Sequence, residues 1–425
     1  MDPLSVGVAS LPLVVIMIAL RVPIAVTLLG VSLGGIWLIL GERPAMGILT
    51  TVPYHFAASW TLSSVPMFLL MGYIAYHSGL TRGLFEAARV WLGWLPGGLA
   101  IASLFGATGF AAVTGSSVAC SAAMGRIAVP EMHRSGYHLG IATGTVAAGG
   151  TIGALIPPSI ILILYGIQAQ VSITTLFLGG LFVGLATLVG YVAVVLVVAW
   201  AKPGYLPRQP VLKGQKWASL IQIWPTAMLV SCVFGGLFSG YFTATEAGAV
   251  GAILTVIIGV ARGSLSREAF FQSCLDTLLS SASLFIIAVA ANAFTRLIAL
   301  SGLSAALGGW IGDLGAPPFV ILLAIVLLYL MLGMFLEPIG AMLLTLPLVL
   351  PIITTNGIDL IWFGILVAKL LEIGMITPPV GLNVFVIHSV ARDLVNLETI
   401  FYGVSLFILA DVVLVLAMIL SRNLF

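Results

Sequence analysis

Charged side chains are scarce in this sequence of 425 residues. Asp, Glu, Lys and Arg together make up 7% of it, whereas a soluble chain has about 25%. Hydrophobic residues make up 61%, and the mean hydropathy is +1.22. No polar stretch is long enough to form a separate soluble domain. The composition therefore indicates an all-α polytopic membrane protein.

Other absences narrow the function. Cys120, Cys232 and Cys274 are scattered and have neither disulfide nor metal spacing. The sequence has no HExxH, GxSxG or phosphate-binding loop, so it predicts neither an enzyme nor ATP hydrolysis on this chain. The net charge of +2 is too small to imply a nucleic-acid partner. The first apolar run lies between Asp2 and Arg21, the reverse of a signal peptide, so we expect a retained helix.

Apolar runs of about 20 residues predict membrane spans. Such runs lie at 4–20, 22–40, 60–79, 137–168, 172–201, 219–240, 244–261, 277–300, 358–391 and 398–421. Two further stretches, 97–133 and 317–355, do not fit as single spans. Each has two short apolar arms around a polar break, Gly115-Ser116-Ser117 in the first and Glu337-Pro338 in the second. We expect both to be re-entrant hairpins that return the chain to the side from which it came.

The distribution of basic residues supports this topology. With the N-terminus outside and each hairpin counted as no net crossing, twelve Lys and Arg residues fall on the cytoplasmic side and two outside. Such a positive-inside bias is typical of membrane proteins. The cytoplasmic residues are Arg21, Arg82, Arg89, Arg126, Arg134, Lys202, Arg208, Lys213, Lys216, Arg262, Arg267 and Arg392; those outside are Arg43 and Arg422. The first hairpin then enters from the cytoplasm and the second from outside.

One pattern occurs twice. A Pro-Pro pair interrupts the apolar segment 137–168 at Pro157, and another interrupts 358–391 at Pro378, 221 residues later. Proline removes an N–H donor and disfavours helical geometry in the residue before it, so we expect two discontinuous helices. The same shift carries Pro130 onto Pro351 and the first hairpin break onto the second. An odd number of crossings separates the copies, which predicts an inverted repeat. Segments 80–93 and 264–275 are expected to be equivalent amphipathic helices at the cytoplasmic surface.

The four breaks are the candidate sites. If each hairpin tip meets the broken helix of its own repeat, freed carbonyls and hydroxyls could enclose a small hard cation, and half-helix N-termini would face an anionic substrate. The alternative is that small residues here only allow close helix packing. The tip residues are Gly115, Ser116, Ser117, Glu337 and Pro338, with Asn383 after the second break.

The few ionisable residues in apolar segments have two interpretations each. Glu337, at a hairpin tip, is a functional candidate by its depth; alternatively, it is a structural partner of Lys369 or Arg296. Glu372 follows Lys369 by three residues, which favours a structural ion pair on one helix face. Arg296 is expected to extend toward the membrane surface, and Thr243 to Glu246 fits a capping box. The sequence offers no explanation for Asp411.

Five segments carry a family resemblance. They begin at Thr114 (TGSSVA), Gly153 (GALIPPS), Phe242 (FTATEAGA), Gly333 (GMFLEP) and Gly374 (GMITPPVGLN). In order and spacing they resemble the large membrane subunit (permease, M subunit) of tripartite ATP-independent periplasmic (TRAP) transporters, within the ion transporter superfamily. Many members of that family have Ser at the Thr114 position and Asp at the Glu337 position. The first difference keeps a hydroxyl, and the second keeps the charge on a longer side chain.

The resemblance implies an elevator-type transporter. It implies Na⁺-coupled import of an organic acid, such as a C4-dicarboxylate, sialic acid or another sugar acid, across the bacterial inner membrane. The distribution of basic residues then places the N-terminus in the periplasm. It implies a periplasmic solute-binding protein (P type), a small four-helix membrane subunit (Q type) and a lipid environment as partners. One Na⁺ site falls on Thr114, Gly153, Ile156 and Pro158, and a second on Gly333, Gly374, Thr377 and Val380. No other metal or cofactor is implied.

The expected division of labour follows the repeat. Residues 97–168 and 317–391 would form the two halves of a moving transport domain, and 1–96, 169–316 and 392–425 the scaffold. The alternatives are a self-sufficient Na⁺/carboxylate symporter of the same superfamily and a passive channel. The inverted repeat argues against a channel, because a channel does not need two gates of opposite orientation. The amphipathic segments favour a scaffold that a partner subunit braces. Nothing in the sequence distinguishes a dicarboxylate from a sugar acid.

Overall fold

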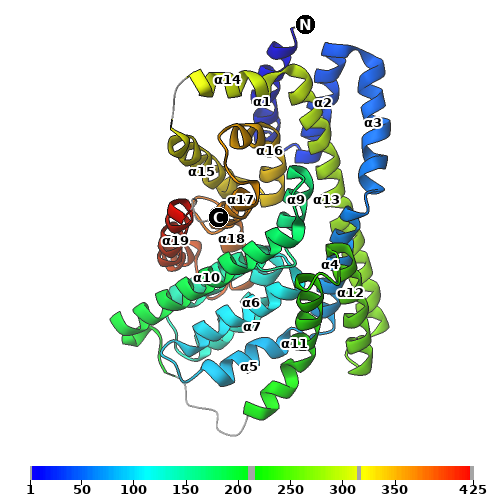
Figure 1. Ribbon diagram of the computed structural model, residues 1–425. Coiled ribbons are helices and arrows are strands. Elements are labelled where there is room, and N and C mark those ends of the chain that lie inside the picture. The colour runs from blue at the N-terminus through cyan, green and yellow to red at the C-terminus, as the bar shows by residue number, and fades with distance from the viewer. Residues whose placement is uncertain (1, 209–215, 314–316, 422–425) are drawn as a thin grey trace.

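The structure is a computed structural model that describes residues 2–208, 216–313 and 317–421 (Figure 1). Lys213 and Arg422, which entered the charge count, lie outside these ranges. All of the regular structure in the described residues is helical. Seven of these helices are long and apolar enough to cross a membrane, or eight if one bent pair is a single span. The predicted all-helical membrane protein is therefore confirmed.

The chain begins with α1 (Pro3–Ala19), α2 (Ile24–Leu40), α3 (Glu42–Ala57), η1 (Thr61–Ser63) and α4 (Ser64–His77). The sequence analysis did not predict α3, which carries Glu42, Arg43 and His55 and is less apolar than its neighbours. This helix and 61–77 meet at a bend of 62°. The predicted span 60–79 is thus the second limb of a bent pair.

The structure has two helices joined at the first predicted hairpin break, followed by the first broken helix. The order is α5 (Arg82–Leu92), α6 (Gly98–Thr114), α7 (Ser117–Arg134), α8 (Leu139–Thr151), η2 (Ile152–Ala154), α9 (Ile160–Ala169), α10 (Ile173–Ala201) and η3 (Pro203–Tyr205). The hairpin turns at Gly115, whose φ of 62° suits glycine. Ser116 caps α7 by accepting a hydrogen bond from the Ala119 N–H.

The middle of the chain holds α11 (Lys216–Phe238), α12 (Ala244–Ala261), α13 (Arg267–Ser301) and α14 (Leu303–Asp313). The predicted capping box is confirmed, because Thr243 and Glu246 bond to each other's backbone N–H at the start of α12. The second amphipathic prediction was wrong. Most of 264–275 is the first part of the continuous helix α13, because no Gly or Pro separates it from the apolar run that follows.

The second half repeats the first. It contains α15 (Pro318–Phe335), α16 (Pro338–Thr355), α17 (Leu360–Gly374), α18 (Leu382–Val390) and α19 (Leu397–Leu420). A shift of 221 carries α7 onto the bounds of α16 and places α6, α8 and α9 within three residues of α15, α17 and α18. The same shift carries α5 onto the bounds of α14, which is therefore the counterpart of α5 in place of 264–275. By length and composition α15 and α16 each also qualify as a span, so the re-entrant path of the hairpins stays a prediction.

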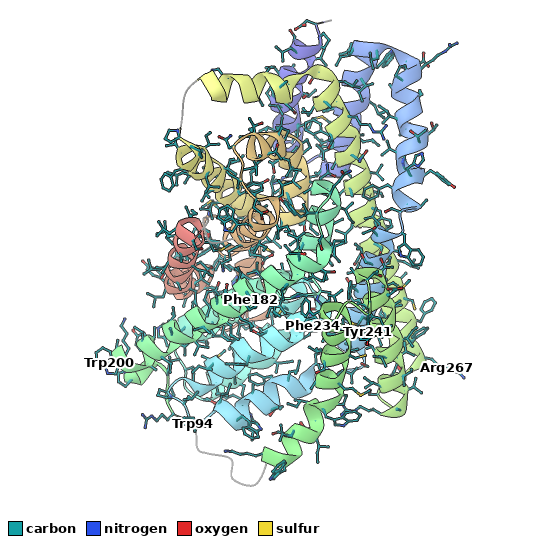
Figure 2. All side chains as sticks on the ribbon, in the orientation of Figure 1. Trp94, Phe182, Trp200, Phe234, Tyr241 and Arg267 are labelled. Atoms are coloured by element: carbon teal, nitrogen blue, oxygen red, sulfur yellow. The ribbon has the colours of Figure 1, made fainter. Side chains whose placement is uncertain are left out.

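Two hydrophobic clusters hold these elements together. One joins α1, α2, α4, α13 and α15–α17, and the other joins α6–α8, α10, α18 and α19. In Figure 1, α2, α3, α12 and α13 run along one side, beside the two hairpins and broken helices. Large apolar side chains also cover the outside. Trp200 lies at the outer end of α10 (Figure 2) and is 85% exposed, and Phe182 of the same helix is 66% exposed, as expected for a surface that faces lipid.

Candidate functional site

The first hairpin tip lies against the first helix break. The Pro158 carbonyl is so close to Gly115 that a Cβ there would overlap it. Gly153, in η2, packs on the backbone of Ser116 and Ser117, with 3.2 Å from an added Cβ to the Ser116 oxygen. Gly115 is therefore required by this backbone contact and by its positive φ, and at Gly153 a larger residue would be tightly packed. Thr114 is buried beside them, and its hydroxyl donates to the Phe110 carbonyl at 3.1 Å.

The second hairpin meets the second break in the same way. A Cβ at Gly374 would overlap the backbone of Gly333, and one at Gly333 would lie 3.0 Å from the Leu371 carbonyl oxygen. Thr377 follows within one turn, and its hydroxyl donates to the Ile373 carbonyl at 2.6 Å. The structure thus brings each hairpin against the broken helix of its own repeat, as the sequence analysis required for a composite site.

Both hairpin tips and both breaks also share one small cavity of about 70 Å³, which we call the tip cavity. Its walls come from repeat-related segments far apart in the sequence. They are Gly115, Ser116, Ser117 and Val118 of the first tip, Ala154, Ile160 and Ile161 of the first break, Glu337, Pro338 and Ile339 of the second tip, and Glu372 and Met375 of the second break. The four breaks therefore converge at one place.

A hydrogen bond crosses between the repeats at this cavity. The Ser117 hydroxyl donates to Glu372 Oε2 at 2.6 Å, and Glu372 is 1% exposed. The predicted ion pair between Glu372 and Lys369 is absent. Lys369 Nζ instead lies 2.6 Å from Asp411 Oδ1, with both side chains fully or almost fully buried. Residues three apart share a helix face, but a buried ammonium pairs with the carboxylate that the neighbouring helix α19 presents to it.

Asp411, which the sequence left without explanation, is the centre of a buried network. Its second carboxylate oxygen accepts a hydrogen bond from the Tyr191 hydroxyl at 2.7 Å. The Tyr191 hydroxyl in turn lies 3.1 Å from Thr151 Oγ1, at the end of α8. Each of α8, α10, α17 and α19 contributes one residue. No local pattern could have found this network, because every contact joins helices distant in the sequence.

Glu337 has neither of the structural partners considered for it. Its Oε2 accepts a hydrogen bond from the Gly340 N–H at 2.9 Å and so caps α16. Arg296 is exposed and contacts Asn292 at 3.4 Å, whereas Lys369 is paired with Asp411. Glu337 occupies the position equivalent to Ser116, the cap of α7, and both caps line the tip cavity. The same N-cap role thus occurs once in each repeat.

The oxygens near the breaks suit a cation that prefers carbonyl ligands. Ile156, Pro158 and Val380 lie outside the helices, and no backbone N–H of the described residues bonds to their carbonyls. Hard cations bind such oxygens, and freed carbonyls at membrane depth need a partner. Thr377 uses its single hydroxyl proton on Ile373, which leaves the oxygen lone pairs for a cation. These oxygens are of the type that Na⁺ prefers, although the Gly374 carbonyl already accepts a hydrogen bond from the Thr377 N–H at 3.1 Å.

A larger cavity of about 690 Å³ opens beside the tips. It lies between the hairpin tips and the helices α4 and α13, where the Tyr73 hydroxyl and Ser280 Oγ are 2.6 Å apart. Among the described residues, its lining contains no Lys or Arg. The polar groups that line it are Tyr73, Tyr76, Thr114, Ser116, Ser280, Ser283 and Glu337. The sequence analysis missed the α4 and α13 wall, because these helices lie outside the repeated breaks.

One predicted site residue lies elsewhere. Asn383 is 0% exposed, and neither of its amide atoms has a hydrogen-bond partner among the described residues. It lines neither the tip cavity nor the larger cavity. Its backbone N–H bonds to the Met375 carbonyl, which ties α18 to the end of α17.

The comparisons with known proteins agree on one family. Residues 11–424 match the family described as "Tripartite ATP-independent periplasmic transporter, DctM component". The C4-dicarboxylate TRAP transporter large permease protein DctM of Pseudomonas aeruginosa is 35% identical over 85% of this chain and 84% of its own. The sialic acid TRAP transporter large permease protein SiaM of Vibrio cholerae is 30% identical over 78% of each chain.

Two further similarities concern architecture. The isethionate TRAP transporter permease protein DctMQ of Oleidesulfovibrio alaskensis is 33% identical over 92% of this chain but only 61% of its own length, so it carries additional sequence. The YdaH transporter of Alcanivorax borkumensis has a similar structure, with a TM-score of 0.66 over 90% of both chains at 15% identity. That likeness concerns the fold.

Proposed function

Because this chain belongs to the DctM family of TRAP transporter large permeases, a family of multi-pass inner-membrane proteins that transport organic acids, we propose that it imports an organic acid by coupling uptake to Na⁺ entry. The observation that carries this proposal is the convergence of both hairpin tips and both helix breaks on the tip cavity. Inverted pairs of broken segments are how many secondary transporters build a midplane site.

Two Na⁺ ions would bind where each hairpin meets its broken helix. The first would contact Thr114, Gly153, Ile156 and Pro158, and the second Gly333, Gly374, Thr377 and Val380. The substrate would sit in the larger cavity near Ser116 and Glu337, facing the N-termini of α7 and α16. Since the described lining of that cavity has no Lys or Arg and includes Glu337, the bound cations would have to offset the negative charge of both Glu337 and an anionic substrate.

The moving unit would contain both hairpins and both broken helices. We add α10 and α19 to it, because the buried ion pair between Lys369 and Asp411 joins α19 to α17, and the hydrogen bond from Tyr191 to Asp411 joins α10 to α19. Separation of that pair during each cycle would leave two uncompensated charges in the protein interior. The remaining helices would form the scaffold, with an N-terminus in the periplasm.

The partners follow from the family. We propose that a periplasmic binding protein delivers the substrate and that a small membrane subunit braces the scaffold. The relatives compared above are named for C4-dicarboxylates, sialic acid and isethionate, and we propose that the substrate here is an organic acid of this general class. The competing functions are a self-sufficient Na⁺/carboxylate symporter and a passive channel.

Transport assays in proteoliposomes can distinguish these three functions. The chain would be placed in proteoliposomes alone, with its membrane subunit, and with both the subunit and the loaded binding protein. We expect accumulation of labelled organic acid only with the complete set and an inward Na⁺ gradient. Accumulation by the chain alone would identify a self-sufficient symporter, and equilibration without accumulation would identify a channel. Uptake that persists when choline replaces Na⁺ would refute Na⁺ coupling.

A further inference from the structure

The four-residue network of Thr151, Tyr191, Asp411 and Lys369 runs from one broken helix to the other. Thr151 is the last residue of α8 and lies two positions before Gly153. Lys369 lies in α17, five positions before Gly374. Between them, Tyr191 of α10 and Asp411 of α19 complete a path with successive contacts of 3.1, 2.7 and 2.6 Å. Because Tyr191 donates its proton to Asp411, the path is continuous when the Thr151 hydroxyl donates to Tyr191 and not to the Ala148 carbonyl, which is 2.7 Å away. The path therefore joins the end of α8, beside the first proposed Na⁺ site, to a point in α17 more than one helical turn before the second.

The network is not a by-product of the internal repeat. The positions related to Lys369 and Asp411 by the shift of 221 are Ala148 and Gly190. Neither of those residues can make an ion pair, so the network occurs only once. A structural element needed equally by each half would be expected in both halves. Its single occurrence between the halves favours a role that involves them jointly.

Burial makes this path stiff. Thr151, Tyr191 and Lys369 are 0% exposed and Asp411 is 1% exposed. A buried polar network is costly when only part of it is satisfied, because no water replaces a lost partner. If the end of α8 shifts, the Tyr191 hydroxyl that contacts Thr151 must move with it. The Asp411 carboxylate must then adjust, because one of its oxygens binds Tyr191 and the other binds Lys369. Displacement at one break would thus be passed to the other helix.

We infer that this network couples the two Na⁺ sites, with Tyr191 as the positioning residue that connects them. Binding at the first break would fix the end of α8 and, through Tyr191 and Asp411, favour the geometry of α17 that binds the second ion. The coupling is reciprocal, because each site must affect the other by the same factor. This inference rests on the proposed Na⁺ coupling and adds cooperativity between the ions to it.

The test is a Na⁺ titration of the purified full-length chain in lipid nanodiscs. Thermal unfolding would be followed as NaCl replaces choline chloride at constant ionic strength. Tyr191→Phe removes only the hydroxyl and leaves the ion pair between Lys369 and Asp411 in place. For the wild-type chain we expect a Hill coefficient above 1, with an upper limit of about 2 for two sites. For Tyr191→Phe we expect about 1, with roughly five-fold weaker apparent affinity, at the lower end of usual coupling factors.

Two further variants separate coupling from a structural effect. Of the contacts in the path, Thr151→Val removes only the one between Thr151 and Tyr191, and it should give the same Hill coefficient as Tyr191→Phe. Tyr329→Phe removes a comparable buried hydroxyl, which contacts Thr345 at 2.9 Å within the second hairpin, away from the path. It should lower the unfolding temperature but keep the wild-type Hill coefficient.

The outcomes are distinct. A cooperative wild-type titration that Tyr191→Phe or Thr151→Val leaves unchanged would overturn the inference, as would a non-cooperative titration of the wild-type chain. Both results would leave Na⁺ coupling intact. A wild-type chain whose stability does not respond to Na⁺ at all would refute the Na⁺ sites and the inference together.

Discussion

Ser117 of the first hairpin and Glu372 of the second broken helix are joined by a hydrogen bond of 2.6 Å. The two residues are 255 positions apart and belong to different repeats. This contact places the tip of one half directly on the break of the other. Both halves of the chain therefore contribute residues to the same place.

Loss of this bond should destabilise the folded protein. Ser117→Ala would leave the buried Glu372 carboxylate without its hydrogen-bond donor, at a cost of about 1–3 kcal/mol. Thermal unfolding of the purified chain measures the effect. Ser121→Ala is the matched control, because Ser121 lies one turn further along α7, is also buried, and has no hydrogen-bond partner among the described residues. Equal unfolding temperatures for the two variants would contradict a stabilising role for the Ser117 contact.

The buried ion pair should depend on both partners together. Lys369→Met would leave Asp411 unpaired inside the protein, which costs about 3–5 kcal/mol. The double variant Lys369→Met, Asp411→Asn removes both charges and keeps an acceptor for Tyr191, so it should recover most of the lost stability. Unfolding temperatures and yields of folded membrane protein test this. A double variant no more stable than Lys369→Met would argue against pairing as the cause.

Thr377 should set the Na⁺ requirement of the second site. Thr377→Val is nearly isosteric but removes the hydroxyl oxygen, and we expect normal folding with a roughly tenfold higher Na⁺ requirement, equivalent to about 1.4 kcal/mol. Na⁺-dependent uptake by the complete transporter measures this shift. Thr345→Val, which removes a buried hydroxyl in the second hairpin, should leave the Na⁺ requirement unchanged. An unaltered requirement in Thr377→Val, with transport intact, would reduce Thr377 to a packing residue.

Cross-links can test the division into moving unit and scaffold. A Cβ at Gly125 would lie 3.8 Å from that of Val390, which joins the first hairpin to α18 and suits a disulfide. A Cβ at Gly106 would lie 3.4 Å from that of Phe85, which joins the same hairpin to α5. In a chain whose native cysteines are replaced, oxidation of Gly125→Cys, Val390→Cys should preserve transport, and oxidation of Gly106→Cys, Phe85→Cys should stop it. The opposite pattern would reverse the assignment of α5.

The sequence allowed much of this architecture to be predicted, for a physical reason. Breaks inside apolar segments are visible as Pro-Pro, Gly and polar tips, since hydrocarbon excludes them from ordinary spans. The hairpins, the broken helices and the repeat shift of 221 followed from those residues. The convergence of the breaks could only be stated as a condition, which the packing of Gly115 on Pro158 and of Gly374 on Gly333 now fulfils.

The errors have an equally physical origin. Lys369 was assigned to Glu372 because helix periodicity reveals only neighbours on the same helix. Its partner Asp411 lies on α19, and no sequence pattern links the two helices. The helix α14 was not predicted, because the mixture of polar and apolar residues in 264–275 was interpreted as the counterpart of α5. A shift of α5 by 221 positions indicates 303–313 instead. The helix α3 was missed because its charged and polar residues interrupt the apolar pattern.

The most direct measurement of the central claim follows both solutes in one experiment. Proteoliposomes containing the complete transporter would be given labelled organic acid together with ²²Na⁺, and the initial uptake of each would be recorded. The two proposed cation sites predict that substrate entry is accompanied by about two Na⁺ per molecule, since both ions would move with the hairpins. Substrate uptake without any accompanying ²²Na⁺ entry would contradict Na⁺-coupled transport through these breaks.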